Sequence, residues 1–199
     1  MLFENRDGEL VDVTQEVAPE FQDFGIVNDI QTTDVNNDGW PDFIAVGEWT
    51  GIGVFVNQQG TFTNMAEEDA MLSEKGWWFS VTETDVNNDN LPDYVVGNVG
   101  LNIKFKASKE KPFKVYATDF DENGTTDIVL SKKYKGTYVP VRGRECSSQQ
   151  MPFIKEKFET YSEFANASLV DIYGEKLSSS YESSATELQS IVLINKGNL

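Results

Sequence analysis

The chain has 199 residues, of which 39% are hydrophobic and 12% aromatic, enough for the core of one domain or two small ones. Its 33 acidic and 16 basic residues give a formal net charge of −17, which argues against nucleic-acid binding because phosphates require a basic face. The sequence has no histidine and a single cysteine, Cys146, which excludes catalytic pairs that need histidine, His-containing zinc sites and internal disulfides.

The first residues, MLFENRDGEL, contain Glu4 and Arg6 where a secretion signal needs an apolar core, so no signal peptide is predicted. No apolar run reaches 18 residues, so no transmembrane segment is predicted either. Instead, LFENRDGEL at 2–10 predicts a β-hairpin, because an apolar run, an asparagine and a turn with glycine precede another apolar residue. The same pattern recurs as VFVNQQGTF at 54–62 and VLINKGNL at 192–199.

A nine-residue acidic loop occurs three times, as DVNNDGWPD, DVNNDNLPD and DFDENGTTD. Positions 1, 3, 5 and 9 carry side-chain oxygens, and position 6 is a residue that tolerates positive φ. These oxygens and the carbonyl of position 7 suit calcium, which takes six to eight oxygen ligands. The predicted ligands are Asp34, Asn36, Asp38, Trp40 and Asp42 in the first loop, Asp85, Asn87, Asp89, Leu91 and Asp93 in the second, and Asp119, Asp121, Asn123, Thr125 and Asp127 in the third.

One such loop alone is equally well explained as a polar turn between strands. Three copies in register, each with the ninth aspartate, favour metal binding. An EF-hand loop begins in the same way but requires flanking helices and a glutamate at position 12, where this chain has Ala45, Val96 and Leu130. The apolar runs FIAVG, YVVGN and IVLS follow the three loops and predict buried strands.

Hairpin and loop keep a nearly constant spacing, since Asn5 precedes Asp34 by 29 positions and Asn57 precedes Asp85 by 28. A unit of about four short strands that recurs near 50 residues predicts propeller blades. The second unit is expected to form a less regular hairpin around residues 102–119, with a solvated Lys-rich turn at 104–114. The third unit is expected to be shorter than the first two.

After Gly143 the pattern becomes helical. Capping boxes are predicted at Ser147 with Gln150 and at Thr160 with Glu163, and the second helix is expected to stop at Gly174. We predict two helices, a polar loop at 178–184 and a final strand. The expected organisation is one propeller fragment over 1–199, with blades and three calcium loops in 1–143, a helical insertion in 144–174 and a return to the blade hairpin in 175–199.

DVNNDGWPDFIAVG and DVNNDNLPDYVVGN resemble FG-GAP/VCBS repeats, which build calcium-binding β-propellers such as the head of integrin α chains. VRGRECSSQQMPFIKEKF and YSEFANASLVDIYG resemble VCBS-repeat surface proteins of Bacteroidetes-type bacteria, including the ASPIC/UnbV group. The resemblance implies a mainly β fold, a partial propeller of about three to four blades with a small inserted helical segment, and up to three Ca²⁺. Because four to eight blades close a propeller, the chain is expected to be continuous with further blades in a longer protein.

These features predict a non-catalytic, calcium-stabilised module for adhesion or for recognition of a protein or glycan, in the extracellular space, at the cell surface or in the periplasm, where weak calcium sites can fill. The alternatives are a hydrolase or lyase acting on polysaccharide with calcium assisting, and an intracellular calcium sensor. No catalytic residue is assigned.

Two further groups of residues are interpreted as structural. Arg142 and Arg144 could bind an anionic ligand, but pairing with Glu145 and neighbouring acids is favoured, and Cys146 is expected to be structural or incidental rather than reactive. The tryptophans are expected to fill space between blades rather than to stack on a sugar. They are Trp40, Trp49, Trp77 and Trp78.

Overall fold

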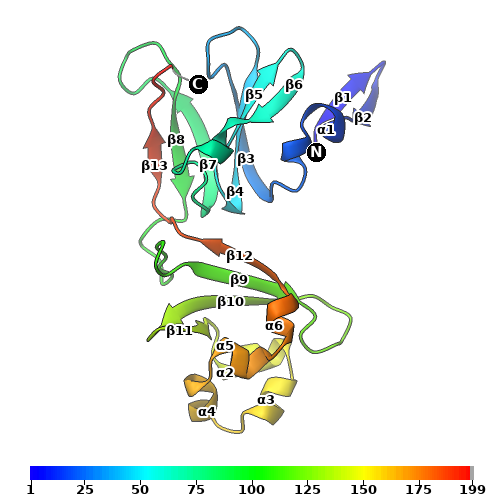
Figure 1. Ribbon diagram of the computed structural model, residues 1–199, viewed down its shortest axis with the longest axis vertical. Helices are drawn as coiled ribbons and strands as arrows, with labels where there is room; N and C mark the ends of the chain where they lie inside the picture. The colour runs from blue at the N-terminus through cyan, green and yellow to red at the C-terminus, as the bar shows by residue number, and fades with distance from the viewer. Residues whose placement is uncertain (198–199) are drawn as a thin grey trace. The chain divides into compact units, whose positions relative to one another are not determined.

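The computed structural model describes residues 1–197, except for the side chains of residues 67 and 68. It divides the chain into two compact units (Figure 1). The first consists of Met1–Lys104 and the segment that begins at Glu187, and the second is Phe105–Thr186. The second unit is therefore an insertion in the sequence of the first, and its boundaries differ from the predicted segments 1–143, 144–174 and 175–199.

The first unit contains one complete antiparallel meander. Strands β3 (Ile26–Thr33), β4 (Asp42–Thr50), β5 (Gly53–Gln58) and β6 (Thr61–Asn64) pair in chain order. The first six residues of β4 are all buried, because this strand has a neighbour on each edge and packed side chains on each face. The meander has the strand order expected of one propeller blade.

The C-terminal segment supplies the third strand of the second repeat. Strand β7 (Gly76–Thr84) pairs with β8 (Asp93–Asn98), and β13 (Ile191–Leu193) pairs with the other edge of β8. The hairpin predicted around 102–119 is wrong, since residues 101–112 contain no strand and β9 (Phe113–Thr118) belongs to the second unit. The Lys-rich segment offers few apolar residues for the place beside β8, whereas the C-terminal run supplies Ile191 and Leu193 to the core.

The hairpin predicted at the N-terminus is confirmed. Strands β1 (Phe3–Arg6) and β2 (Glu9–Asp12) form a two-stranded sheet. Asp7 and Gly8 have φ of 55° and 94°, as expected of a two-residue turn that matches the twist of the strands. Short helical segments follow both the β1–β2 hairpin and the β5–β6 hairpin. They are α1 (Thr14–Val17) and η1 (Pro19–Phe21) after β2, and η2 (Met65–Glu68) after β6.

The first unit has a core on each face of the β4–β5 sheet. One is aliphatic and includes Ile44, Val54 and the buried Trp78, and the other is aromatic and includes Phe43 stacked on Phe55 at a centroid distance of 4.6 Å. Burial of such side chains is the main stabilising term of the fold. Trp78 is buried in the core, whereas Trp40 on the first acidic loop is 46% exposed, so the predicted packing role is wrong for Trp40.

The second unit has a four-stranded antiparallel sheet in the order β11-β10-β9-β12, formed with β10 (Asp127–Tyr134), β11 (Thr137–Pro140) and β12 (Tyr181–Ala185). Between β11 and β12 lie α2 (Arg144–Gln150), α3 (Phe153–Lys157), α4 (Tyr161–Asn166), α5 (Leu169–Tyr173) and α6 (Lys176–Ser179). Figure 1 shows these helices gathered along one side of the sheet, where Ile154, Leu169 and Ile172 are 0–1% exposed.

The helical segment corrects three predictions. Five short helices replace the two predicted, and α6 and β12 occupy much of the predicted polar loop at 178–184. The capping box of Thr160 and Glu163 is confirmed, with both of its hydrogen bonds. The one predicted at Ser147 is wrong, because α2 already begins at Arg144 and Ser147 is buried within it. The Ser147 hydroxyl donates to the carbonyl of Arg142 at 3.3 Å instead of accepting from a backbone N–H at the start of a helix.

The fold is thus mainly β, with several antiparallel sheets and a helical layer in the second unit. Among the described residues the strands do not close into a propeller. In the same part of the chain, no helix has the length and apolar character needed to cross a membrane.

Candidate metal-binding loops

The three acidic loops share one pattern of backbone hydrogen bonds. The carboxylate at position 1 accepts from the N–H groups of positions 5 and 6, as Asp34 does from Asp38 at 3.0 Å and from Gly39 at 2.9 Å. Position 6 has positive φ in every copy, with Gly39 at 86°. The corresponding bonds join Asp85 to Asp89 and Asn90 at 3.2 and 3.0 Å, and Asp119 to Asn123 and Gly124 at 3.0 and 2.7 Å.

The side-chain oxygen of position 5 accepts a hydrogen bond from the backbone N–H of position 7, the residue whose carbonyl is a predicted ligand. Asp38 accepts from the N–H of Trp40 at 2.8 Å. The equivalent bonds run from Leu91 to Asp89 at 2.9 Å and from Thr125 to Asn123 at 2.8 Å. Each loop is therefore folded around its own side-chain oxygens, an arrangement in which turn-forming residues replace regular backbone pairing.

The ninth aspartate is the first residue of the following strand and is buried in all three copies. Asp42, Asp93 and Asp127 are 2%, 0% and 3% exposed. One oxygen of each accepts from the backbone N–H of position 2, which closes the loop. The donors are Val35 at 2.8 Å, Val86 at 2.9 Å and Phe120 at 3.0 Å.

The other oxygen of the ninth aspartate joins the first two loops to the third strand of their repeats. Asp42 accepts from the N–H of Asn57 at 2.7 Å, and Asp93 accepts from the N–H of Asn195 at 2.9 Å. Sequence reasoning missed this role of the two asparagines. The signal was present, because Asn57 and Asn195 occupy the same position in the repeated hairpin pattern.

Burial and neighbouring acids act on the ionisation of these loops. Burial raises the pKa of Asp42, an effect opposed by the N–H groups of Asn57 and Val35. Burial also raises the pKa of Asp127, with further contributions from Asp121 and Asp119. In contrast, the N–H of Gly124 lowers the pKa of the Asp119 carboxyl. Burial thus disfavours the charged form of Asp42 and of Asp127, and a cation bound at either loop would offset that cost.

The third loop brings its carboxylates closest together. Single oxygens of Asp119, Asp121 and Asp127 all lie within 4.8 Å of one another. Oδ1 of Asp121 is buried and accepts no hydrogen bond from any described residue, a costly state for a carboxylate oxygen. A bound cation would satisfy it, so these residues fit a calcium ion. Of the five predicted ligands of this loop, the three aspartates therefore lie close together.

The first two loops do not bring three acidic oxygens this close within the described residues. Their third positions are Asn36 and Asn87, whose amide oxygens accept from the N–H groups of Asp38 and Asp89 at 3.1 and 3.0 Å. The full predicted ligand set of these loops stays a prediction.

Residues 34–96, from the first loop into β8, match the family model of the FG-GAP-like repeat. This stretch is an FG-GAP-like repeat. The FG-GAP-like repeat contains the first two acidic loops with β4, β5, β6 and β7, and it ends within β8. The third loop lies outside the match, although the side chains at its positions 1, 5 and 9 make the same bonds to the loop backbone. Comparisons with curated proteins and with solved structures found no match.

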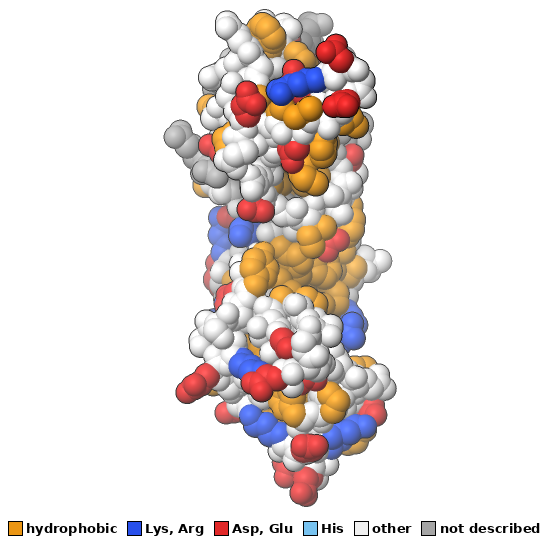
Figure 2. Space-filling view, turned by 90° about the vertical axis from the view of Figure 1, so that its right-hand side faces the viewer, with side chains coloured by type: hydrophobic (Ala, Val, Ile, Leu, Met, Phe, Trp, Pro, Cys, Tyr) orange, Lys and Arg blue, Asp and Glu red, His pale blue; other side chains and the backbone are white. Residues whose placement is uncertain are grey.

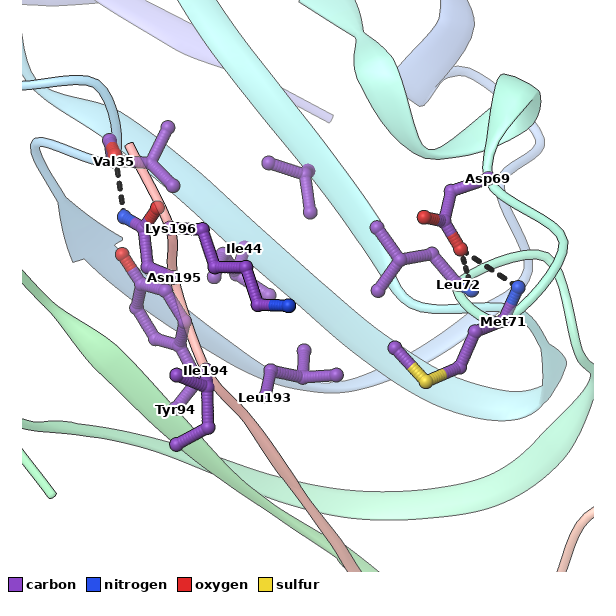
Figure 3. Close-up of a pocket in the computed structure, with 11 residues that line it drawn as sticks. Val35, Ile44, Asp69, Met71, Leu72, Tyr94, Leu193, Ile194, Asn195 and Lys196 are labelled. Carbon is purple, nitrogen blue, oxygen red and sulfur yellow. Dashed lines mark hydrogen bonds between the residues drawn. The ribbon is translucent and has the colours of Figure 1, made fainter. Parts of the chain in front are cut away.

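A cavity of about 260 Å³ opens beside the FG-GAP-like repeat in the first unit (Figure 3). Ile44, Val54 and Leu193 contribute apolar lining, and Lys196 and Asp69 contribute charge. The Asp69 carboxylate accepts from the backbone N–H groups of residues 71 and 72, at 2.7 and 3.0 Å.

Tyr94 also lines this cavity. Its hydroxyl shares a hydrogen bond of 2.7 Å with that of Thr33. Burial raises the pKa of Tyr94 to about 12, so the phenol is neutral at physiological pH. The cavity therefore offers mainly apolar surface with a few polar groups, as ligand pockets commonly do.

The arginine segment forms part of a second cavity, of about 300 Å³, in the second unit. Arg144 donates to the carbonyl of Phe158 at 2.6 Å, and its guanidinium lies 5.3 Å from the ring centroid of Tyr161. Glu145 forms its ion pair with Lys155 at 3.1 Å, and nearby Arg144 also helps to lower the pKa of Glu145 and of Glu163 through its charge. Cys146 is exposed.

Proposed function

We propose that the chain is a calcium-stabilised recognition module in which each acidic loop holds one Ca²⁺. The observation that carries this proposal is the third loop, where Asp119, Asp121 and Asp127 converge around a buried oxygen without a hydrogen-bond donor. Calcium takes oxygen ligands from carboxylates, amides, carbonyls and water, and each predicted set has this composition. Because the same backbone cage occurs three times, up to three ions are proposed.

The proposed role of calcium is structural. The ninth aspartate joins each of the first two loops to the third strand of its repeat through Asn57 or Asn195. A cation at the loop would neutralise the carboxylates that burial and mutual repulsion disfavour. An ion that binds only the folded chain stabilises it by mass action, by about 2.7 kcal/mol when its concentration is 100 times Kd.

The proposed setting is extracellular, at the cell surface or in the periplasm, because FG-GAP-like repeats are typical of extracellular proteins and weak calcium sites require millimolar ion. The proposed ligand is a protein or a glycan, and the chain is proposed to be continuous with further blades. The alternative is a polysaccharide hydrolase or lyase that uses the cavity of Tyr94 and Lys196. We favour binding, since Asp69 and Tyr94 are already engaged in hydrogen bonds.

Bound calcium per chain, measured by equilibrium dialysis, tests the proposal. Asp121→Asn should lower the stoichiometry by about one ion. Glu122→Gln is the matched control, because it removes one charge from the same loop at an exposed residue outside the predicted ligand set. Equal stoichiometry in both variants, or the absence of bound calcium in the parent chain, would refute the assignment. Turnover of a glycan panel that depends on Tyr94 would favour the alternative.

A further inference from the structure

The cavity of the second unit gathers two of the three arginines in the sequence. Arg142 and Arg144 lie where β11 leads into α2, and both line this cavity of about 300 Å³. The third arginine, Arg6, lies on β1. A guanidinium is a planar fork that can bind a carboxylate through two parallel N–H···O bonds, whereas a lysine ammonium is a point charge. Two arginines in one cavity of a chain with a net charge of −17 therefore need an explanation.

Arg144 is held in a fixed position beside the cavity. Its Nε donates to the carbonyl of Phe158 at 2.6 Å, and its Nη2 donates to the carbonyl of Lys155 at 3.4 Å. Its guanidinium also lies 5.3 Å from the ring centroid of Tyr161, which is within the range of a cation–π interaction. The Nη1 group of Arg144 donates to no described residue. Arg144 is therefore oriented in advance and still has donors for a ligand.

Arg142 has an uncompensated charge. Its side chain is exposed and forms no ion pair or hydrogen bond with any residue that the structure describes. Only its backbone carbonyl is engaged, by the hydroxyl of Ser147. By contrast, Lys176 of the same unit pairs with Glu122 at 3.0 Å, and Figure 2 shows basic side chains beside acidic ones at its lower end, where the second unit is drawn. The guanidinium of Arg142 is thus available to an anion from solution.

The acidic residues near the two arginines are bound to other partners. Glu145 accepts from Lys155 at 3.1 Å and from the hydroxyl of Tyr161 at 3.3 Å. Glu163 accepts from the N–H of Thr160 at 2.8 Å in the capping box. These bonds keep both carboxylates charged but do not reach Arg142. Because two negative charges stay close by, the cavity favours an anion with a single charge, such as a carboxylate, over a doubly charged phosphate.

The remainder of the cavity lining is largely apolar. Val139, Val141, Phe164 and Ala167 contribute to it, and Phe164 and Ala167 are 5% and 8% exposed. Tyr161 adds an aromatic ring that is 64% exposed. A volume of this size is at the lower end for ligand pockets, and apolar walls with a few polar groups are typical of them. The lining therefore suits a compact apolar body attached to the anionic group.

We propose that this cavity is a binding site for a small carboxylic acid with an apolar body, such as an aryl or alkyl acid. Arg142 donates to the carboxylate, Arg144 supplies a second positive charge, and the apolar walls cover the body of the ligand. All lining residues lie within 139–167, so the site is separate from the three acidic loops and from the cavity of Tyr94. The inference goes beyond the proposed calcium role and does not require it.

Isothermal titration calorimetry with the whole chain in millimolar calcium tests this assignment. Phenylacetate and hexanoate are the probes, and we expect saturable binding of at least one of them at one molecule per chain. Phenylacetamide has nearly the same shape as phenylacetate but no charge, and acetate has the charge but almost no apolar body. Each of these two should bind at least tenfold more weakly than the better probe.

Arg142→Gln should weaken binding of the better probe at least tenfold. It should leave the melting temperature unchanged, because the side chain makes no bond with a described residue. Arg6→Gln is the matched control, since it makes the same replacement on β1, where Arg6 pairs with Glu4 at 2.6 Å, and it should leave affinity unchanged.

The proposal is overturned if neither probe binds, if phenylacetamide or acetate binds as tightly as the better probe, if Arg142→Gln keeps full affinity, or if Arg6→Gln causes an equal loss. Bound calcium per chain, measured separately, reports on the proposed metal role alone.

Discussion

Asn195 is the residue whose replacement best tests how the repeats are joined. Its backbone N–H binds Asp93, and its side chain donates to the buried carbonyl of Val35 at 2.7 Å and accepts from Gly197 at 2.9 Å. Asn195→Ala keeps the backbone bond and removes both side-chain bonds. It thereby separates the C-terminal segment from the first acidic loop, which lies 160 positions away in the sequence.

The expected cost follows from burial. A typical hydrogen bond contributes about 1 kcal/mol net, and a buried group left without a partner costs about 1–3 kcal/mol. Val35 is 2% and Asn195 9% exposed, so we expect Asn195→Ala to lower the free energy of unfolding by about 2–4 kcal/mol. Asn57→Ala removes the corresponding bonds to Pro41 and Gly60 and should cost a similar amount.

Asn5→Ala is the matched control at the equivalent position of the exposed hairpin, where one exposed bond to Gly8 is lost. Its expected cost is below about 1 kcal/mol. Urea unfolding followed by tryptophan fluorescence reports on the first unit alone, because all four tryptophans lie before Lys104. An equal cost for Asn5→Ala and Asn195→Ala would refute the reasoning, as would a negligible cost for Asn195→Ala.

Three further predictions concern calcium, pH and packing. Millimolar calcium should raise the melting temperature relative to EDTA, and coincident melts would contradict the proposed structural role. The folded-state pKa of Tyr94 is about 12 against an ordinary value of 10.0. Between these values the Tyr94 phenol keeps its proton in the folded state and loses it in the unfolded state. The free energy of unfolding should therefore fall as pH rises from about 10 to 12. Tyr94→Phe should remove that part of the pH dependence in alkaline unfolding curves. Gly47→Ala places a Cβ 2.0 Å from the carbonyl oxygen of Ile26. It should destabilise the first unit by about 1–3 kcal/mol in the same urea assay. An unchanged unfolding midpoint would show that β3 can shift to accept the Cβ without loss of stability.

Much of the local structure could be predicted from the sequence, because it depends on bonds between near neighbours. The carboxylate of Asp34 meets N–H groups four and five positions later, and that of Asp42 meets one seven positions earlier. Turn residues, the ninth aspartate and the apolar run after it therefore predicted the loops and strands β4, β8 and β10. The two hairpins with complete turns, β1–β2 and β5–β6, followed from the same local chemistry.

The segments that were predicted wrongly are those whose structure depends on distant partners. Serine-rich β12 is a strand because β9 offers it a free edge, and residues such as Ser183 are small enough to be buried there. The segment at 144–179 forms five helices because it must cover one face of the second sheet, and a pair of capping patterns did not reveal those breaks. Neither outcome is visible in local propensity, since packing overrides it.

By itself, the sequence determined three acidic loops, the strand after each and the repeated hairpin with its asparagine, since all of these arise from contacts within about ten residues. Only the tertiary structure decided that β13 is the third strand of the second repeat, where the backbone N–H of Asn195 donates to Asp93 across 102 positions. It also decided that, within residues 1–197, β1 pairs only with β2, whereas the matching β5 is paired on both edges. Strand pairing uses the same backbone groups at every residue, so the choice of partner comes from burial and geometry that act across the whole chain.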